Sequence, residues 1–172
     1  KKNKNFLDKK FQNTKIIIEN VALGSKNDTK ILKQFNESSS STFSEIDENS
    51  KYFKKKFNLI NLFRSKKNYN EVKINTETLY DYINKNELQF VDIIKIDTEG
   101  FEYNILQGLK DNIKKIQLIL FEHHYDNMIK KNYTFSDINN LLVQKNFYMV
   151  YKAKMPLRRT FEYIYINKLF KK

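Results

Sequence analysis

The sequence of 172 residues has no cysteine, one proline and only three glycines. Without cysteine there is no disulfide framework, no cysteine-based metal site and no thiol nucleophile. The glycines, Gly24, Gly100 and Gly108, leave no Gly-x-Gly pattern of the kind that approaches a bound cofactor. No apolar run nears the ~20 residues that span a bilayer, and the basic N-terminus lacks the apolar segment of a secretory signal. We therefore expect an intracellular, cytoplasmic location with no membrane partner.

Arginine is also scarce, although the formal net charge is +12. Only three of the 32 basic residues are arginines, namely Arg64, Arg158 and Arg159. Nucleic-acid recognition usually depends on arginine, and here the lysines accompany many Asn, Ile, Tyr and Phe residues, as A/T-rich codons would produce. A solvated lysine surface is therefore favoured over nucleic acid as a partner, and a basic nucleic-acid-binding domain is kept as a third hypothesis.

The most informative stretch is residues 90–100. Residues 90–97 form a β-branched apolar run, which predicts a strand buried on both faces of a parallel sheet. The run ends in Asp97-Thr98-Glu99-Gly100, and ligands of open α/β sheets bind at the carboxyl ends of strands. A helix is expected over 101–110. In the alternative interpretation, Asp97 and Glu99 merely cap that helix.

The remaining pattern alternates between strands and helices, which predicts a single α/β domain over 1–172. The last two strands are close in sequence and should pair as an antiparallel hairpin. The segment 25–75 is the least regular, and we expect an insertion or acceptor-side segment there, with a serine-rich loop at 37–41. Further strands are expected at 15–23, 31–35, 72–74, 116–122, 147–151 and 161–166, and helices within 1–14, from Thr76, and from Thr134 or Ser136.

Three short motifs resemble the FkbM-type methyltransferases. They are the run Ile94-Lys95-Ile96-Asp97-Thr98-Glu99-Gly100-Phe101-Glu102, the triplet Leu106-Gln107-Gly108 and the triplet Phe121-Glu122-His123. The resemblance implies a Rossmann-like methyltransferase sheet, mainly parallel with a terminal antiparallel strand. It also implies S-adenosylmethionine as cofactor and methyl transfer to a hydroxyl of a sugar, glycan or small metabolite.

The sequence departs from that family at its start. The glycine-rich loop after the first family strand is absent, as is the acid that ends the second, so the resemblance begins at the third strand. This predicts weak or no binding of S-adenosylmethionine and a carboxyl-terminal portion of a longer enzyme, with the first strands of the fold missing. A non-catalytic remnant or binding module of the same fold is the alternative.

Candidate site residues follow from the strand ends and from the resemblance. Strands 90–97 and 116–122 should lie side by side, which brings their terminal carboxylates and imidazoles together. A positioned base helps a hydroxyl attack, and one of the histidines could instead pack locally. A divalent metal is possible but not implied. The catalytic candidates are Asp97, Glu99 and His123; the cofactor candidates are Asn20, Val21, Ala22 and Asp97; the substrate candidates are Glu122, His124, Ser41 and Thr42.

Overall fold

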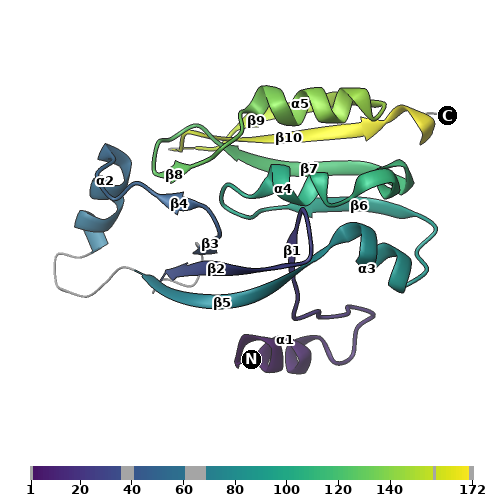
Figure 1. Ribbon diagram of the computed structural model, residues 1–172, viewed down its shortest axis with the longest axis horizontal. Helices are drawn as coiled ribbons and strands as arrows, with labels where there is room; N and C mark the ends of the chain where they lie inside the picture. Colours follow the sequence, from purple (N-terminus) through teal and green to yellow (C-terminus); the bar gives the residue numbers. More distant parts are fainter. Residues whose placement is uncertain (1, 36–40, 61–68, 157, 171–172) are drawn as a thin grey trace.

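A computed structural model describes residues 2–35, 41–60, 69–156 and 158–170 as a mixed α/β structure (Figure 1). The helices are α1 (Lys2–Phe11), α2 (Lys51–Ile60), α3 (Leu79–Lys85), α4 (Glu102–Gln107) and α5 (Phe135–Gln144), with 3₁₀ turns η1 (Lys110–Lys115) and η2 (Lys168–Phe170). The strands are β1 (Ala22–Gly24), β2 (Asp28–Phe35), β3 (Ser41–Thr42), β4 (Glu45–Ile46), β5 (Tyr69–Thr78), β6 (Val91–Ile96), β7 (Ile116–His124), β8 (Ile129–Lys130), β9 (Phe147–Lys154) and β10 (Thr160–Asn167).

Two four-stranded sheets and one short two-stranded sheet organise the described residues. One sheet has the order β6-β7-β10-β9, the second has the order β1-β5-β2-β3, and β4 pairs with β8. The expected antiparallel hairpin is confirmed in β9 and β10. Parallel pairing within the described ranges is confined to β6 with β7 and β1 with β5, so the sheets are less parallel than predicted.

The hydrophobic core lies between the first sheet and the helices α4 and α5, which lie along it in Figure 1. Ile119 and Phe121 of β7 point into this core because successive side chains of a strand alternate between its faces. The Phe121 ring stacks on Tyr163 of β10, with 5.4 Å between the ring centroids. Burying each such side chain stabilises the fold by about 1.5–3 kcal/mol. β7, which lies between β6 and β10 in the sheet, therefore contributes strongly to the core.

Two strand predictions need correction. The strand expected at 15–23 is reduced to β1, and Ile16 and Ile17 before it are 53% and 79% exposed. The strand at 90–97 is present as β6, but only one of its faces is buried, since Ile93 is 62% exposed. An apolar run is buried on both faces only where other elements cover both, and composition alone does not reveal that cover.

The segment 25–75, expected to be irregular, contains regular structure in its described part. β2 and β5 form an eight-pair antiparallel ladder from Asp28 opposite Thr76 to Phe35 opposite Tyr69. The predicted loop at 37–41 lies outside the described residues except for Ser41, which belongs to β3. The helix expected from Thr76 begins instead after Thr78, because the Thr76 hydroxyl bonds the carbonyls of Lys26 and Asp28 within the sheet region.

Other predicted elements are confirmed. α5 begins after Thr134, whose hydroxyl accepts from the Asp137 N–H while Asp137 accepts from the Thr134 N–H. This reciprocal capping box decides between the two caps that the sequence offered. The helix expected over 101–110 is shorter, because α4 ends at Gln107 and the chain continues into the 3₁₀ turn η1.

Candidate functional site

The turn after β6 carries two carboxylates, Asp97 and Glu99, which do not cap the following helix. Phe101 occupies the N-cap position of α4 and makes no side-chain capping bond. Asp97 instead lies 3.8 Å from the Lys95 ammonium, and Glu99 lies 3.3 Å from His124 Nε2. The alternative of two capping acids is therefore wrong, and both carboxylates are available for other interactions.

Glu102 holds this turn in place. Its fully buried carboxylate accepts hydrogen bonds from the Gly100 N–H at 2.8 Å and the Thr98 hydroxyl at 3.2 Å. Its other oxygen accepts from the Tyr133 hydroxyl at 2.5 Å. Burial and the Glu102 charge raise the pKa of Tyr133, so that phenol remains a donor. Three donors on one buried carboxylate fix the geometry of residues 98–100.

The turn also has an unusual backbone. Glu99 has φ of 49° and Gly100 has φ of 93°, both in the left-handed region. A Cβ on Gly100 would lie 2.5 Å from Ile129 Cγ2, so only glycine fits there. The Thr42 hydroxyl donates to the Glu99 carbonyl at 2.7 Å, which fastens β3 to this turn.

The first cavity opens beside this turn, with a volume of about 730 Å³. It brings together residues from three parts of the chain that the sequence analysis singled out separately. Ser41 and Thr42 reach it because β3 is bonded to the turn. The candidate residues that line the cavity are Asn20, Val21, Ala22, Ser41, Thr42 and Asp97, and its other walls include Leu23, Phe43, Thr98, Phe101 and Ile105.

An ionic chain runs across the ends of β6 and β7. The Lys95 ammonium lies 3.8 Å from Asp97 and 4.0 Å from Glu122. Burial, and then the charge of Asp97, raise the pKa of Glu122. The predicted side-by-side placement of the two strand ends is thus present, with Lys95 between the carboxylates. Lys95 was part of the quoted motif but was given no role.

His124 is buried between two carboxylates. Its Nε2 faces Glu99, and its Nδ1 lies 3.0 Å from the Thr160 hydroxyl and 3.7 Å from Asp126. Burial alone would lower the pKa of His124, but the Asp126 and Glu99 interactions outweigh it and raise that pKa. His124 therefore carries positive charge over a wider pH range than a free histidine.

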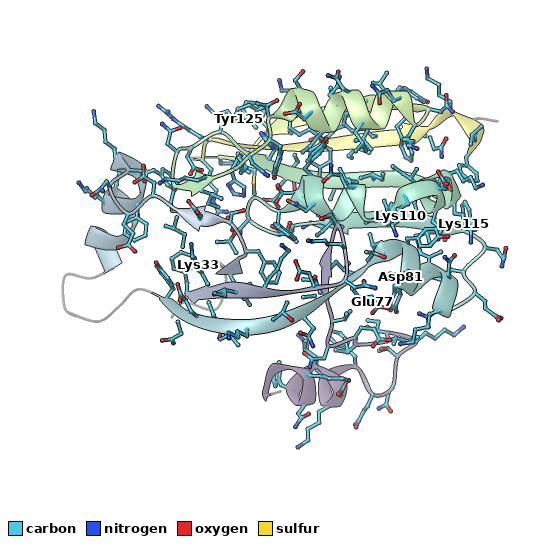
Figure 2. The ribbon with its side chains drawn as sticks, viewed as in Figure 1. Lys33, Glu77, Asp81, Lys110, Lys115 and Tyr125 are labelled. Carbon is cyan, nitrogen blue, oxygen red and sulfur yellow. The ribbon has the colours of Figure 1, made fainter. Side chains whose placement is uncertain are left out.

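His123 points to the other face of β7 and lies in a second cavity of about 690 Å³. It is 3% exposed, its Nδ1 has no hydrogen-bond partner among the described residues, and the ring of Tyr125 (labelled in Figure 2) lies 4.8 Å away. Burial lowers its pKa to about 3, so the imidazole is neutral. His123 and Asp97 line different cavities, which have no lining residue in common.

The sequence analysis missed several residues of this region. Glu102 lay in the quoted motif, and its place in the first helical turn after a glycine was the signal available. Asp126, Lys131 and Tyr133 follow β7 in a loop with no motif, so no sequence signal marked them. Lys131 donates to the His124 carbonyl, and burial lowers the pKa of its ammonium.

Two features are absent from the described residues, a cluster of metal ligands and a membrane-spanning helix. Within the described ranges, no group of three or more His, Asp or Glu side chains is arranged to hold a metal ion. No helix in the described part of the chain is long and apolar enough to cross a membrane.

The described structure is a mixed α/β fold in which a fixed acidic turn at a strand end opens on a cavity, which is where α/β domains commonly bind ligands. A family model for the methyltransferase FkbM domain matches residues 2–150. The chain therefore belongs to the FkbM methyltransferase family. Separate comparisons with curated proteins and with solved structures gave no match.

Proposed function

We propose that this chain is an S-adenosylmethionine-dependent O-methyltransferase domain whose acceptor is a hydroxyl of a sugar, glycan or small metabolite. One observation carries the proposal. The first cavity gathers every predicted cofactor residue, namely Asn20, Val21, Ala22 and Asp97, in a chain of the FkbM methyltransferase family.

The cavity suits the cofactor in size and chemistry. Its volume of about 730 Å³ is within the range of small-molecule sites. Val21, Ala22 and Phe101 offer apolar walls to an adenine ring, and the Asp97 carboxylate offers an acceptor to ribose hydroxyls or a counter-charge to a sulfonium. The strand order β6-β7-β10-β9, with antiparallel β10, supports a Rossmann-like methyltransferase sheet.

When bound, S-adenosylmethionine supplies an electrophilic methyl group, so the protein's task is orientation, water exclusion and removal of one proton. Glu99 and His123 were both candidates for the base. Glu99 is favoured, because it follows Asp97 by two residues in the same fixed turn, although it does not itself line the first cavity; His123 lines the other cavity. The charged His124 beside Glu99 would orient that carboxylate.

Isothermal titration of S-adenosylhomocysteine tests the cofactor assignment. Because the chain has no Gly-x-Gly loop, we expect weak binding, and Asp97→Asn should weaken it at least about tenfold, or by about 1.4 kcal/mol. Asp92→Asn is the matched control, because Asp92 is an exposed carboxylate at the other end of the same strand and does not line the cavity. Equal affinities for the two variants would contradict the role of Asp97. No binding to the parent chain would contradict the proposal and favour a non-catalytic remnant.

A further inference from the structure

A third cavity, of about 460 Å³, lies between the start of α2 and the loop that leads into β10. Lys51 and Lys55 line it from α2, one helical turn apart, and Arg159 lines it from the loop. The Arg159 carbonyl accepts a hydrogen bond from the Tyr125 N–H at 2.7 Å, which fixes the arginine backbone beside the end of β7. In Figure 1, α2 lies at the edge of the molecule beyond β4 and β8.

The three cations are not neutralised by partners within the described structure. Neither lysine nor Arg159 makes an ion pair with a described side chain, although the cavity also contains Asp47 and Asp126. Both carboxylates already accept hydrogen bonds within the protein. Asp47 accepts from the Asn49 N–H, and Asp126 accepts from the Met128 N–H and faces the His124 imidazole. Three cations and two carboxylates leave the cavity lining with a net charge of +1.

This third cavity adjoins the second. Asp47, Asp126 and Asn127 line both, so the two cavities share part of their walls. At the far end of the second cavity, His123 is 97% buried and its Nδ1 has no hydrogen-bond partner in the described ranges. The His123 imidazole is neutral and lines this cavity, where a neutral ring can hydrogen-bond a ligand hydroxyl as donor or acceptor according to its tautomer.

The walls near His123 are aromatic. The ring of Tyr125 lies 4.8 Å from the imidazole, and the rings of Tyr133 and Phe135 each lie 6.0 Å away. The two adjoining cavities thus present a neutral imidazole among aromatic rings in one and three cations beside two carboxylates in the other. A small molecule that carries both hydroxyls and a negative charge complements both cavities.

We propose that the adjoining second and third cavities bind a small hydroxylated molecule with an anionic group, a carboxylate or a phosphate, held by Lys51, Lys55 and Arg159. The proposal does not rest on the proposed function and does not make this molecule the methyl acceptor, because neither cavity shares a lining residue with the first. The short basic lining, three cations beside two carboxylates, favours a small molecule over a nucleic-acid backbone, which would need an extended basic groove.

Ligand-observed NMR titrations with matched sugars test this inference without any cofactor. Glucuronate and glucose differ by one carboxylate, and glucose 6-phosphate supplies the phosphate arm. We expect glucuronate, glucose 6-phosphate or both to bind at least about fivefold more tightly than glucose. Lys55→Gln and Arg159→Gln should each reduce that preference at least about threefold and leave the affinity for glucose unchanged.

Neighbouring residues supply the controls. Lys54→Gln and Arg158→Gln remove the same charges from exposed positions that do not line the cavity, and they should change the preference by less than about twofold. Equal binding of the three sugars, or equal effects of lining and control variants, would overturn the proposal. So would tighter, Lys55-dependent binding of a short single-stranded DNA.

These results are separable from the cofactor assignment. Loss of S-adenosylhomocysteine binding in the earlier titration leaves the sugar titrations interpretable, because no lining residue is common to the first and third cavities. If the chain binds S-adenosylhomocysteine but shows no preference for the anionic sugars, only the proposal that the second and third cavities bind an anionic molecule is overturned.

Discussion

At the scale of single residues, two adjacent histidines have opposite environments because they project from opposite faces of β7. His123 is held among aromatic rings and faces no carboxylate partner, whereas His124 is placed between Glu99 and Asp126. The sequence could place both at a strand end, but could not assign them to opposite faces with different partners, although both line the second cavity. That separation depends on which elements pack on each face, and no local pattern contains that information.

The pH dependence of the two histidines follows from those environments. We expect the His124 imidazole to titrate above its ordinary pKa of 6.5, and His123 to stay neutral until about pH 3 or until the fold is lost. Because the chain has two histidines, His123→Gln and His124→Gln assign their ring signals in a proton NMR titration. Similar pKa values for both would contradict the account.

The sign of each stability effect can be stated. Folding raises the pKa of His124, so its ion pairs stabilise the fold fully below pH 6.5, and this contribution is lost as pH rises through the raised pKa. Folding lowers the pKa of His123, so its contribution is full above 6.5 and is lost as pH falls toward about 3. The free energy of unfolding, measured by urea denaturation, should therefore fall less between pH 6.5 and 9 for His124→Gln than for the parent chain.

The buried Glu102 network predicts a difference between two neighbouring tyrosines. Tyr133→Phe removes a donor from a fully buried carboxylate and should lower the free energy of unfolding by about 1–3 kcal/mol. Tyr103 stacks on the Tyr133 ring, and its hydroxyl makes no hydrogen bond within the described residues, so Tyr103→Phe should change stability by less than about 0.5 kcal/mol. Chemical denaturation of both variants checks this, and equal losses would contradict the role of Glu102.

At the scale of elements, the positions of most strands were predictable, but not which of their faces other elements cover. The apolar run at 116–122 is buried as β7 because β6 and β10 flank it. β6 pairs only with β7 in the described structure, so its equally apolar run exposes Ile93. The run at 15–23 forms three strand residues for the same reason, since β1 pairs only with β5 within those ranges.

The start of α5 was predictable to within two residues, because the sequence offered Thr134 and Ser136 as caps and the structure has Thr134. Thr134→Ala should destabilise the protein by about 1 kcal/mol, because it removes both halves of the α5 capping box. Ser136→Ala, the other position that the sequence offered, is exposed and should change the free energy of unfolding by less than about 0.5 kcal/mol. Thermal or urea unfolding of the pair decides, and a larger loss for Ser136→Ala would contradict the assignment of the cap.

At the scale of the whole molecule, the predicted site is divided rather than single. The resemblance selected Asn20, Ser41 and Asp97, which are far apart in sequence, and the structure brings them to one cavity through the parallel β1–β5 pairing and the β3 contact with the turn. Spacing alone could not have joined them. The second and third cavities depend on α2 and on the loop after β7, for which the sequence carried no motif.

The most direct test of the central claim is a titration of the ¹⁵N-labelled chain with S-adenosylhomocysteine, followed by amide NMR shifts. This reads location as well as affinity, so it works for weak binding. The account predicts saturable shifts at residues 20–23, 41–43 and 97–98, absent in Asp97→Asn, with residues 123–135 little affected. Shifts concentrated at 123–135, or no saturable shift at millimolar ligand, would contradict the assignment of the first cavity to the cofactor.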